Sequence, residues 1–212
     1  MNSSFISKYK PAIILTLALT IFLASSKLPG KSWVVSTLAG SGIPAQFDEP
    51  YGVAVDSSGN VYVADTANHI IWRIESGGET QYLRAQFIGP HAVAVDSSGN
   101  IYVADTGNNC IRKITSAGKV TTFAGSGTAG HIDATGTAAQ FDFPTGVAVD
   151  SSGNIYVADL FNHRIRKITS EGVVTTIAGG FNRPHGVAVD SSGSIVYVGD
   201  TGGHRIRKIE YK

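Results

Sequence analysis

Residues 146–168 read GVAVDSSGNIYVADLFNHRIRKI, and closely similar stretches begin at Gly52, Ala92 and Gly186. The copies are spaced 40, 54 and 40 residues apart at their first aspartates, Asp56, Asp96, Asp150 and Asp190. The repeating unit is therefore about forty residues long, with one insertion between the second and third copies. Self-similarity at such a period is the signature of a repeat architecture, in which neighbouring units bury a shared core.

Apolar and small residues alternate over two runs in each copy, here residues 146–150 and 155–159. A period of two is expected of β-strands, and the Ser-Ser-Gly between the runs suits a tight hairpin whose glycine takes a positive φ. A third run follows at 164–168 and a fourth at 173–177. Four antiparallel strands in forty residues form a propeller blade, so the sequence predicts an all-β, four-bladed propeller.

The repeats resemble those of the NHL family, named for an Asn-His-Leu triplet. This chain varies the triplet as Asn68-His69-Ile70 and Asn162-His163-Arg164. The resemblance covers about residues 32–209 and implies a β-propeller. Members of the family include secreted binding modules, scaffold and RNA-binding proteins, and a lyase that completes peptide amidation. A shared fold supports many functions, so the resemblance implies the architecture more strongly than the activity.

The order of strands suggests how the blades close. Trp33–Leu38 (WVVSTL) resembles the outer strand Lys119–Phe123 but precedes the first hairpin, whereas the last repeat stops after its third strand at Ile209. Pairing of this N-terminal strand with Arg205–Ile209 would complete four blades of four strands and cover both sheet edges. The NHL propellers that the chain resembles generally have five or six blades. We expect a monomer, with an assembly of two chains as the alternative.

The N-terminus has the layout of a signal peptide. Lys8 and Lys10 precede an apolar run, Ala12–Ala24, which is followed by small polar residues. The run is shorter than the roughly 20 residues of a stable bilayer-spanning helix. We therefore expect residues 1–26 to direct export and 27–212 to form the propeller, in a secreted, extracellular or periplasmic protein. The alternative is an uncleaved membrane anchor.

Composition excludes several classes of function. The whole chain has 17 basic and 16 acidic residues, and loss of residues 1–26 changes its net charge from +1 to −1. Such a chain has no field to hold a polyanion, so nucleic acid is not an expected partner. The single cysteine, Cys110, rules out an intramolecular disulfide and a multi-thiolate zinc site, and we expect a packed thiol.

Four residues directly after prolines mark the start of each innermost strand, near the expected mouth of the central channel. They are Tyr51, His91, Thr145 and His185. In a four-bladed ring the second and fourth repeats face each other, which would direct His91 and His185 at one volume. Neutral imidazoles bind zinc and other divalent metals, but a catalytic zinc normally has three protein ligands. The resemblance implies that zinc histidines of the amidating lyase match these two positions, while its third histidine has no counterpart, so packing of the channel mouth is the favoured role.

The repeated charged residues are expected to be structural. Each repeat has a second aspartate nine or ten residues after the first: Asp65, Asp105, Asp159 and Asp200. Both aspartates recur with the same neighbours in every repeat, which predicts stabilisation of turns and blades rather than acid and base catalysis. The arginines on the third strands are predicted to form salt bridges to the neighbouring blade: Arg164, Arg166, Arg205 and Arg207.

The insertion, residues 126–143, is the least repetitive segment. Its glycines favour a mobile loop, and His131 and Asp133 give it polar groups at one rim. Loops on a rigid frame are common binding elements, so partner contact and an inert connector are equally open.

The sequence has no nucleophile elbow, phosphate-binding loop, HExxH helix or dinucleotide fingerprint. We therefore predict an exported, non-catalytic binding or scaffold propeller that recognises protein or carbohydrate at one rim. The alternative is a metal-dependent enzyme at the channel mouth, resembling either peptidyl-hydroxyglycine amidating lyase or the lactonases and esterases built on other propellers.

Overall fold

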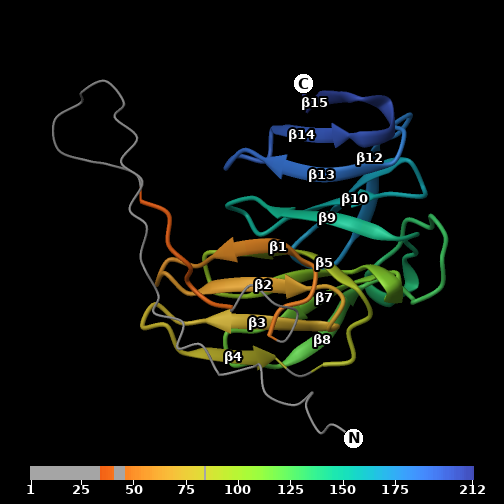
Figure 1. Ribbon diagram of the computed structural model, residues 1–212. Coiled ribbons are helices and arrows are strands. Elements are labelled where there is room, and N and C mark those ends of the chain that lie inside the picture. The colour runs from red at the N-terminus through yellow and green to blue at the C-terminus, as the bar shows by residue number, and fades with distance from the viewer. Residues whose placement is uncertain (1–33, 41–45, 84) are drawn as a thin grey trace, which may run out of the picture. The chain divides into compact units, whose positions relative to one another are not determined.

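The computed structural model describes residues 34–40, 46–83 and 85–212 (Figure 1). The chain divides into two compact units, Met1–Ser36 and Thr37–Lys212. The second unit contains all the strands of the described residues, and the architecture below is that of this unit. The predicted signal peptide, residues 1–26, lies outside the described residues.

The strands form four separate antiparallel sheets, each of which is one blade. Blade 1 contains β1 (Pro50–Val55), β2 (Val61–Asp65), β3 (Ile70–Ile74) and β4 (Thr80–Leu83). Blade 2 contains β5 (Pro90–Val95), β6 (Ile101–Asp105), β7 (Cys110–Ile114) and β8 (Val120–Ala124). Blade 3 contains β9 (Pro144–Val149), β10 (Ile155–Asp159), β11 (Arg164–Ile168) and β12 (Val174–Ala178). Blade 4 contains β13 (Pro184–Val189), β14 (Ile195–Asp200) and β15 (Arg205–Glu210).

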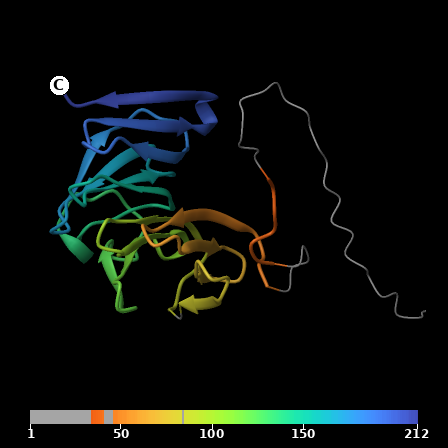
Figure 2. The same ribbon diagram turned by 90° about the vertical axis from the view of Figure 1, so that its left-hand side faces the viewer.

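Three short 3-10 helices accompany the strands of the described chain. They are η1 (Thr106–Asn108), η2 (Gly136–Ala138) and η3 (Thr201–Gly203). The inner strands β1, β5, β9 and β13 pack on one another in chain order, and Figures 1 and 2 show the four sheets following one another in the same order. The predicted all-β propeller of four blades is confirmed.

The predicted closing strand is the exception. The sheet of blade 4 ends at β15 and has three strands, and residues 34–38 of the segment Trp33–Leu38 adopt no strand. Trp33 itself lies outside the described residues. The segment has the composition of an outer strand, but a strand forms only where a sheet edge is presented to it, and composition does not specify which edge that is.

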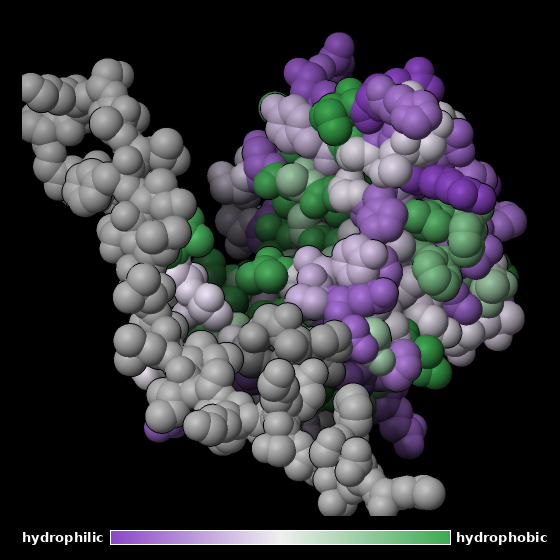
Figure 3. Space-filling model, in the orientation of Figure 1, coloured by the Kyte–Doolittle hydropathy of each residue, from purple (hydrophilic) through white to green (hydrophobic). Residues whose placement is uncertain are grey.

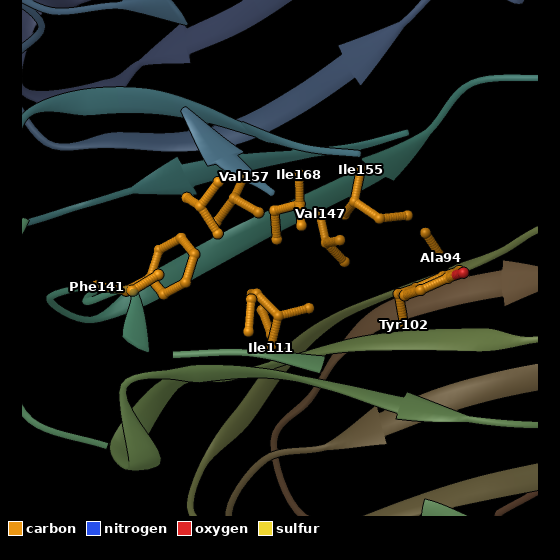
Figure 4. Close-up of a cluster of buried hydrophobic side chains, with 12 residues drawn as sticks. Ala94, Tyr102, Ile111, Phe141, Val147, Ile155, Val157 and Ile168 are labelled. Carbon is orange, nitrogen blue, oxygen red and sulfur yellow. The ribbon is translucent and has the colours of Figure 1, made fainter. Parts of the chain in front are cut away.

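The core lies between the blades. Three clusters of buried side chains fill the spaces between neighbouring blades: one lies between blades 1 and 2, one between blades 2 and 3, and one between blades 3 and 4. Figure 4 shows the middle cluster, in which Ile111 of blade 2 faces Val147 and Val157 of blade 3. Side chains alternate between the two sides of a strand, so each blade contributes one set of apolar residues to the blade before it and another set to the blade after it.

The first aspartate of each repeat closes the inner hairpin, as predicted. Asp56 accepts hydrogen bonds from the amides of Ser58 and Asn60, both at 2.9 Å, and from the hydroxyl of Tyr62 at 3.1 Å. The same bonds recur around Asp96 and Asp150. A carboxylate that accepts several local donors is fully satisfied, which makes this group a structural element of the turn.

The second aspartate of each repeat is buried at the end of the second strand and ties that strand to the loop that precedes the inner strand. Asp159 accepts a hydrogen bond from the amide of Asp142 at 2.8 Å and one from Arg166 Nη1 at 2.8 Å. The corresponding loop amides of the other blades bind Asp65, Asp105 and Asp200. Burial raises the pKa of Asp159, against the opposing effect of its hydrogen bonds from Asn162, Asp142 and Arg166.

The predicted salt bridges between neighbouring blades are wrong for the arginines that form ion pairs. Arg166 pairs with Asp159 of its own blade and with Asp133 of the insertion. Arg205 and Arg207 likewise lie beside Asp200 of their own blade. The cause is the register: Asp159 pairs with Arg164 on β11, so Arg166 is its diagonal neighbour on the same face of the sheet, within reach of a long side chain.

The insertion is bonded along the outer edge of blade 3 and differs from the mobile loop that its glycines suggested. The amide of Val174 donates to the carbonyl of Ala134 at 2.9 Å, and Asp133 accepts from the amide of Thr176 at 2.9 Å. Thr135 also forms a bridge with Val173. The insertion therefore covers the edge of β12, which removes unpaired backbone groups from solvent.

Candidate functional site at the mouth of the inner strands

The residue after each proline is an irregularity in the inner strand. In blade 2, Pro90 pairs with Asp105 and Ala92 with Ala104, which leaves His91 without an opposite residue. His185 occupies the same place between Pro184 and Gly186. A bulge bends the strand and redirects its extra side chain, and such features concentrate near functional sites. The sequence identified these positions by the preceding proline, while the bulge itself emerged only in the structure.

The loops before Pro90, Pro144 and Pro184 are each held by the preceding blade. Gly89 has a φ of 54°, and its amide donates to His69 Nδ1 of blade 1 at 2.8 Å. Arg183 has a φ of 52°, and its amide donates to His163 Nδ1 of blade 3 at 3.2 Å. The histidines of the NHL-like triplet are therefore acceptors for the next blade. Sequence reasoning missed this role, although the histidines just before the third strands of blades 1, 3 and 4 were the signal for it: His69, His163 and His204.

Three of the four predicted residues come together. The rings of Tyr51 and His91 are stacked with centroids 4.5 Å apart, and those of His91 and His185 are 5.4 Å apart. Tyr51 is 59% exposed, while both histidines are half-buried. The fourth residue, Thr145, is buried and donates its hydroxyl to the carbonyl of His185 at 3.2 Å. The result is a row of three rings, which we call the ring row, supported from behind by Thr145.

The two imidazoles favour their neutral form. Burial lowers the pKa of His91, and the neighbouring His185 lowers it further. Burial alone lowers the pKa of His185. Neutral imidazole presents one donor and one acceptor together with an apolar ring face, so at neutral pH the ring row combines stacking surfaces with hydrogen-bonding groups.

We expect replacement of His185 with glutamine to raise the pKa of His91, because the variant removes a neighbouring positive charge and part of the burial. NMR titration of the His91 ring protons measures this pKa. In the parent protein, the folded-state pKa values lie below the ordinary 6.5. The unfolded chain therefore takes up protons on these histidines at a higher pH than the folded protein does. The contribution of the neutral histidines to the free energy of unfolding is complete above pH 6.5 and is lost as the pH falls toward the folded-state pKa values. A His91 pKa that stays constant or falls in the variant would contradict the predicted coupling.

The two histidines supply fewer protein ligands than a zinc site needs. The described residues contain no group of three or more His, Cys, Asp and Glu side chains placed to hold one ion. A catalytic zinc takes three protein ligands, so the pair His91 and His185 fits such a site only in part. The third neighbouring ring, Tyr51, stacks on His91 and does not supply an imidazole or a carboxylate.

The remaining sequence candidates have other environments. His131 is exposed on the insertion. Asp133 binds Arg166 and Thr176, and although burial opposes the shift, these hydrogen bonds lower its pKa. Cys110 is a buried free thiol, as expected, and burial raises its pKa to about 12. Neither Asp133 nor Cys110 therefore offers a free reactive group.

The chain forms four consecutive antiparallel sheets, three with four strands and one with three, and the inner strand of each sheet packs on that of the next. This arrangement defines a β-propeller repeat protein. The profile of the NHL repeat matches residues 47–74, 87–114, 141–168 and 181–209, which is more than half of the chain. The protein belongs to the NHL repeat family. Within the described part of the chain, no helix has the length and apolar character to cross a membrane.

Solved structures share the fold at low sequence identity. A streptogramin B lyase aligns with a TM-score of 0.64 and 17% identity, over 79% of this chain and 53% of its own. An auxiliary nutrient binding protein from Bacteroides ovatus aligns with a TM-score of 0.66 and 22% identity, over 76% and 48%. A nidogen/laminin complex gives a TM-score of 0.64 and 23% identity, over 76% and 60%. The chain thus spans about half the length of the first two of these proteins, and a search of curated proteins found no match.

Proposed function

We propose that this protein is an exported, non-catalytic binding propeller that takes a protein or carbohydrate ligand at the ring row. The observation that carries the proposal is the convergence of Tyr51, His91 and His185 from three separate blades onto one mouth. Export is proposed from the signal-peptide layout of residues 1–26, and mass analysis of the secreted protein's N-terminus tests it.

The physical properties of the ring row support binding. Tyrosine supplies a large contact surface with a polar tip at low entropic cost, and such residues dominate the energy of recognition sites. The two neutral histidines add donors and acceptors without a charge that a ligand would have to desolvate. Similar folds occur in an auxiliary nutrient binding protein and in a nidogen/laminin complex, whose names indicate binding of other molecules.

We expect Tyr51→Ala to weaken ligand binding at least about tenfold, because it removes an exposed ring that stacks on His91. Arrays of glycans and of extracellular proteins identify the ligand, and calorimetry then compares the variants. Tyr211→Ala is the matched control, because this tyrosine is also exposed and lies far from the ring row along the blade: its backbone amide donates to the carbonyl of Ser194, in the turn at the other end of the inner hairpin. Equal effects of the two substitutions would refute binding at the ring row.

The second candidate is a metal-dependent enzyme, and the proximity of the rings of His91 and His185 is the observation that favours it. Metal analysis of the purified protein separates the two candidates. A stoichiometric zinc that is lost in the double variant His91→Ala, His185→Ala would support the enzyme. Ligand binding that persists in the presence of a chelator would support the binding propeller.

A further inference from the structure

Each blade has two faces. The front face is turned toward the following blade, and in blade 1 it contains Ala54, Tyr62 and Ile71, which pack on blade 2. The rear face is turned toward the preceding blade, and in blade 2 it contains Val93 and Val95, which pack on blade 1. Among the described residues, the front face of blade 4 and the rear face of blade 1 have no blade packed against them.

The front face of blade 4 carries the same apolar residues that the other blades bury. Tyr197 is 46% exposed and Ile206 is 77% exposed. The tyrosines and isoleucines at the same repeat positions are all buried: Tyr62, Tyr102, Tyr156, Ile71, Ile111 and Ile165. Blade 4 therefore presents a docking face whose residue types match those of three faces that are already occupied.

The rear face of blade 1 is its counterpart. Val53 and Val55 are 63% and 64% exposed on β1, whereas Val93 and Val147, which are equivalent to Val53, are buried against the preceding blade. Figure 3 shows apolar surface gathered over the inner strands on the side where β1 and β13 lie. In each of the three contacts within the chain, the front face of one blade packs on the rear face of the next. The two uncovered faces are one front face and one rear face, so they could pack on each other in the same way.

Blades 4 and 1 also carry the hydrogen-bonding groups that join neighbouring blades elsewhere in the chain. Within the chain, the Thr66 hydroxyl donates to the carbonyl of Pro90 at 2.7 Å, and His69 accepts from the amide of Gly89. Blade 4 carries Thr201 and His204 at these positions, and His204 has the same left-handed conformation as His69, with φ of 53° and 60°. The matching carbonyl and amide on the rear side of blade 1 belong to Pro50 and Glu49.

A glycine marks the same uncovered contact. A Cβ atom on Gly52 would lie 2.6 Å from Ala92 Cα, so a glycine there permits the close approach of β5. Gly186 occupies the equivalent position in blade 4, where no heavy atom lies within 4 Å of the place that a Cβ would take. The front face of blade 4 therefore has the room that an inner strand requires.

We propose that two copies of this chain dock head to tail, with the front face of blade 4 of each copy on the rear face of blade 1 of the other, in a ring of eight blades. In Figure 1, β1 and β13 lie on the inner sides of blades 1 and 4 with β9 drawn between them, and β4 and β15 lie at the outer ends of these two blades. One chain aligns with about half of the streptogramin B lyase and of the nutrient binding protein. Two such units supply about one complete propeller of that kind, and a heterologous contact that closes gives a ring rather than a filament.

The segment Val34–Leu38 fits the same arrangement. Its Val35 corresponds to Val120 and Val174 on the outer strands of blades 2 and 3, in each case three residues before the residue that is followed by Ala-Gly. Val174 is buried, whereas Val35 is almost fully exposed. In the eight-bladed ring, the blade before blade 1 is blade 4 of the other copy, and that blade lacks its fourth strand. Residues 34–38 supply this strand to the edge of β15.

Analytical ultracentrifugation of the full chain tests the proposal. We expect the parent protein to sediment as two chains, and Ile206→Asp and Val53→Asp each to sediment as one chain. Both side chains are exposed within a single copy, so the variants retain their fold. Ile132→Asp is the control, because Ile132 is also exposed but lies on the insertion. An equimolar mixture of the two interface variants retains one intact contact, so we expect two-chain species to reappear in it.

Two results would overturn the proposal. A parent protein that sediments as one chain at every concentration means that another partner, or the N-terminal residues of the same chain, covers the two faces. Loss of the two-chain species in Ile206→Asp but not in Val53→Asp means that two front faces meet, which is incompatible with a head-to-tail ring.

Discussion

Arg166→Ala is expected to lower the free energy of unfolding by about 3–5 kcal/mol, because it leaves a buried carboxylate without its partner. Arg166 and Asp159 are both fully buried, with Nη1 at 2.8 Å from Asp159 Oδ2. The guanidinium also donates to the carbonyls of Gln140 and Ile132, at 2.8 and 3.1 Å, and stacks over Phe141. One side chain therefore joins the strands of blade 3 to the insertion.

The repeats supply matched controls for this prediction. Arg112 is at the same position in blade 2, partly exposed and 3.2 Å from Asp105, and Arg207 in blade 4 is more exposed and 3.9 Å from Asp200. We expect Arg112→Ala to lower the free energy of unfolding by less than Arg166→Ala does. Arg207→Ala should lower it by no more than about 1 kcal/mol, as is usual for surface ion pairs. Urea unfolding followed by circular dichroism measures all three. Equal losses would show that burial of the pair does not determine its effect.

Gly146→Ala is expected to lower the free energy of unfolding by about 1–3 kcal/mol, because its new methyl group would overlap the carbonyl oxygen of His185. Backbone on one side and the Ala158 side chain on the other leave no flexible group that can yield. Relief of the overlap requires β9 and β13 to separate. The same movement displaces His185 from His91, so we also expect weaker binding at the ring row.

Gly186→Ala is the matched control for Gly146→Ala. No heavy atom lies within 4 Å of a Cβ at Gly186 in the single chain, and its φ lies outside the left-handed region. The substitution reduces the freedom of the unfolded chain, which favours the folded state by about 0.4–1 kcal/mol. Both substitutions are compared in the Val53→Asp background, in which no second copy is expected to pack against Gly186. A loss at Gly186 as large as that at Gly146 would contradict the predicted contact with His185.

Local patterns predicted the elements of this fold well. Alternation predicted the strands, and Ser-Ser-Gly predicted hairpins whose glycine Gly59 has a φ of 82°. The turn role of Asp56 also followed from the sequence, because its partners lie within six residues. Such interactions depend on neighbouring residues along the chain, which a sequence displays directly.

The candidate site was predictable only in part. The prolines identified Tyr51, His91 and His185, but the bulges and the ring distances depend on how separate blades pack. The partner of Arg166 was assigned to the wrong blade, because a diagonal contact across two strands is decided by their register. The insertion also looked mobile by composition, although bonds to β12 hold it along the sheet edge.

Ile71 and Ile206 show the difference between what a repeat's own sequence predicts and what the packing of blades sets. Both are the second residue after the turn histidine of their repeat, on equivalent third strands. The repeat pattern predicts the strand, the strand that pairs with it and the face on which the side chain lies, and the observed registers agree. Yet Ile71 is fully buried and Ile206 is 77% exposed. The difference arises from the packing of whole blades, because the burial of a side chain depends on the blade that lies opposite, and the front face of blade 4 has no such blade within the described chain.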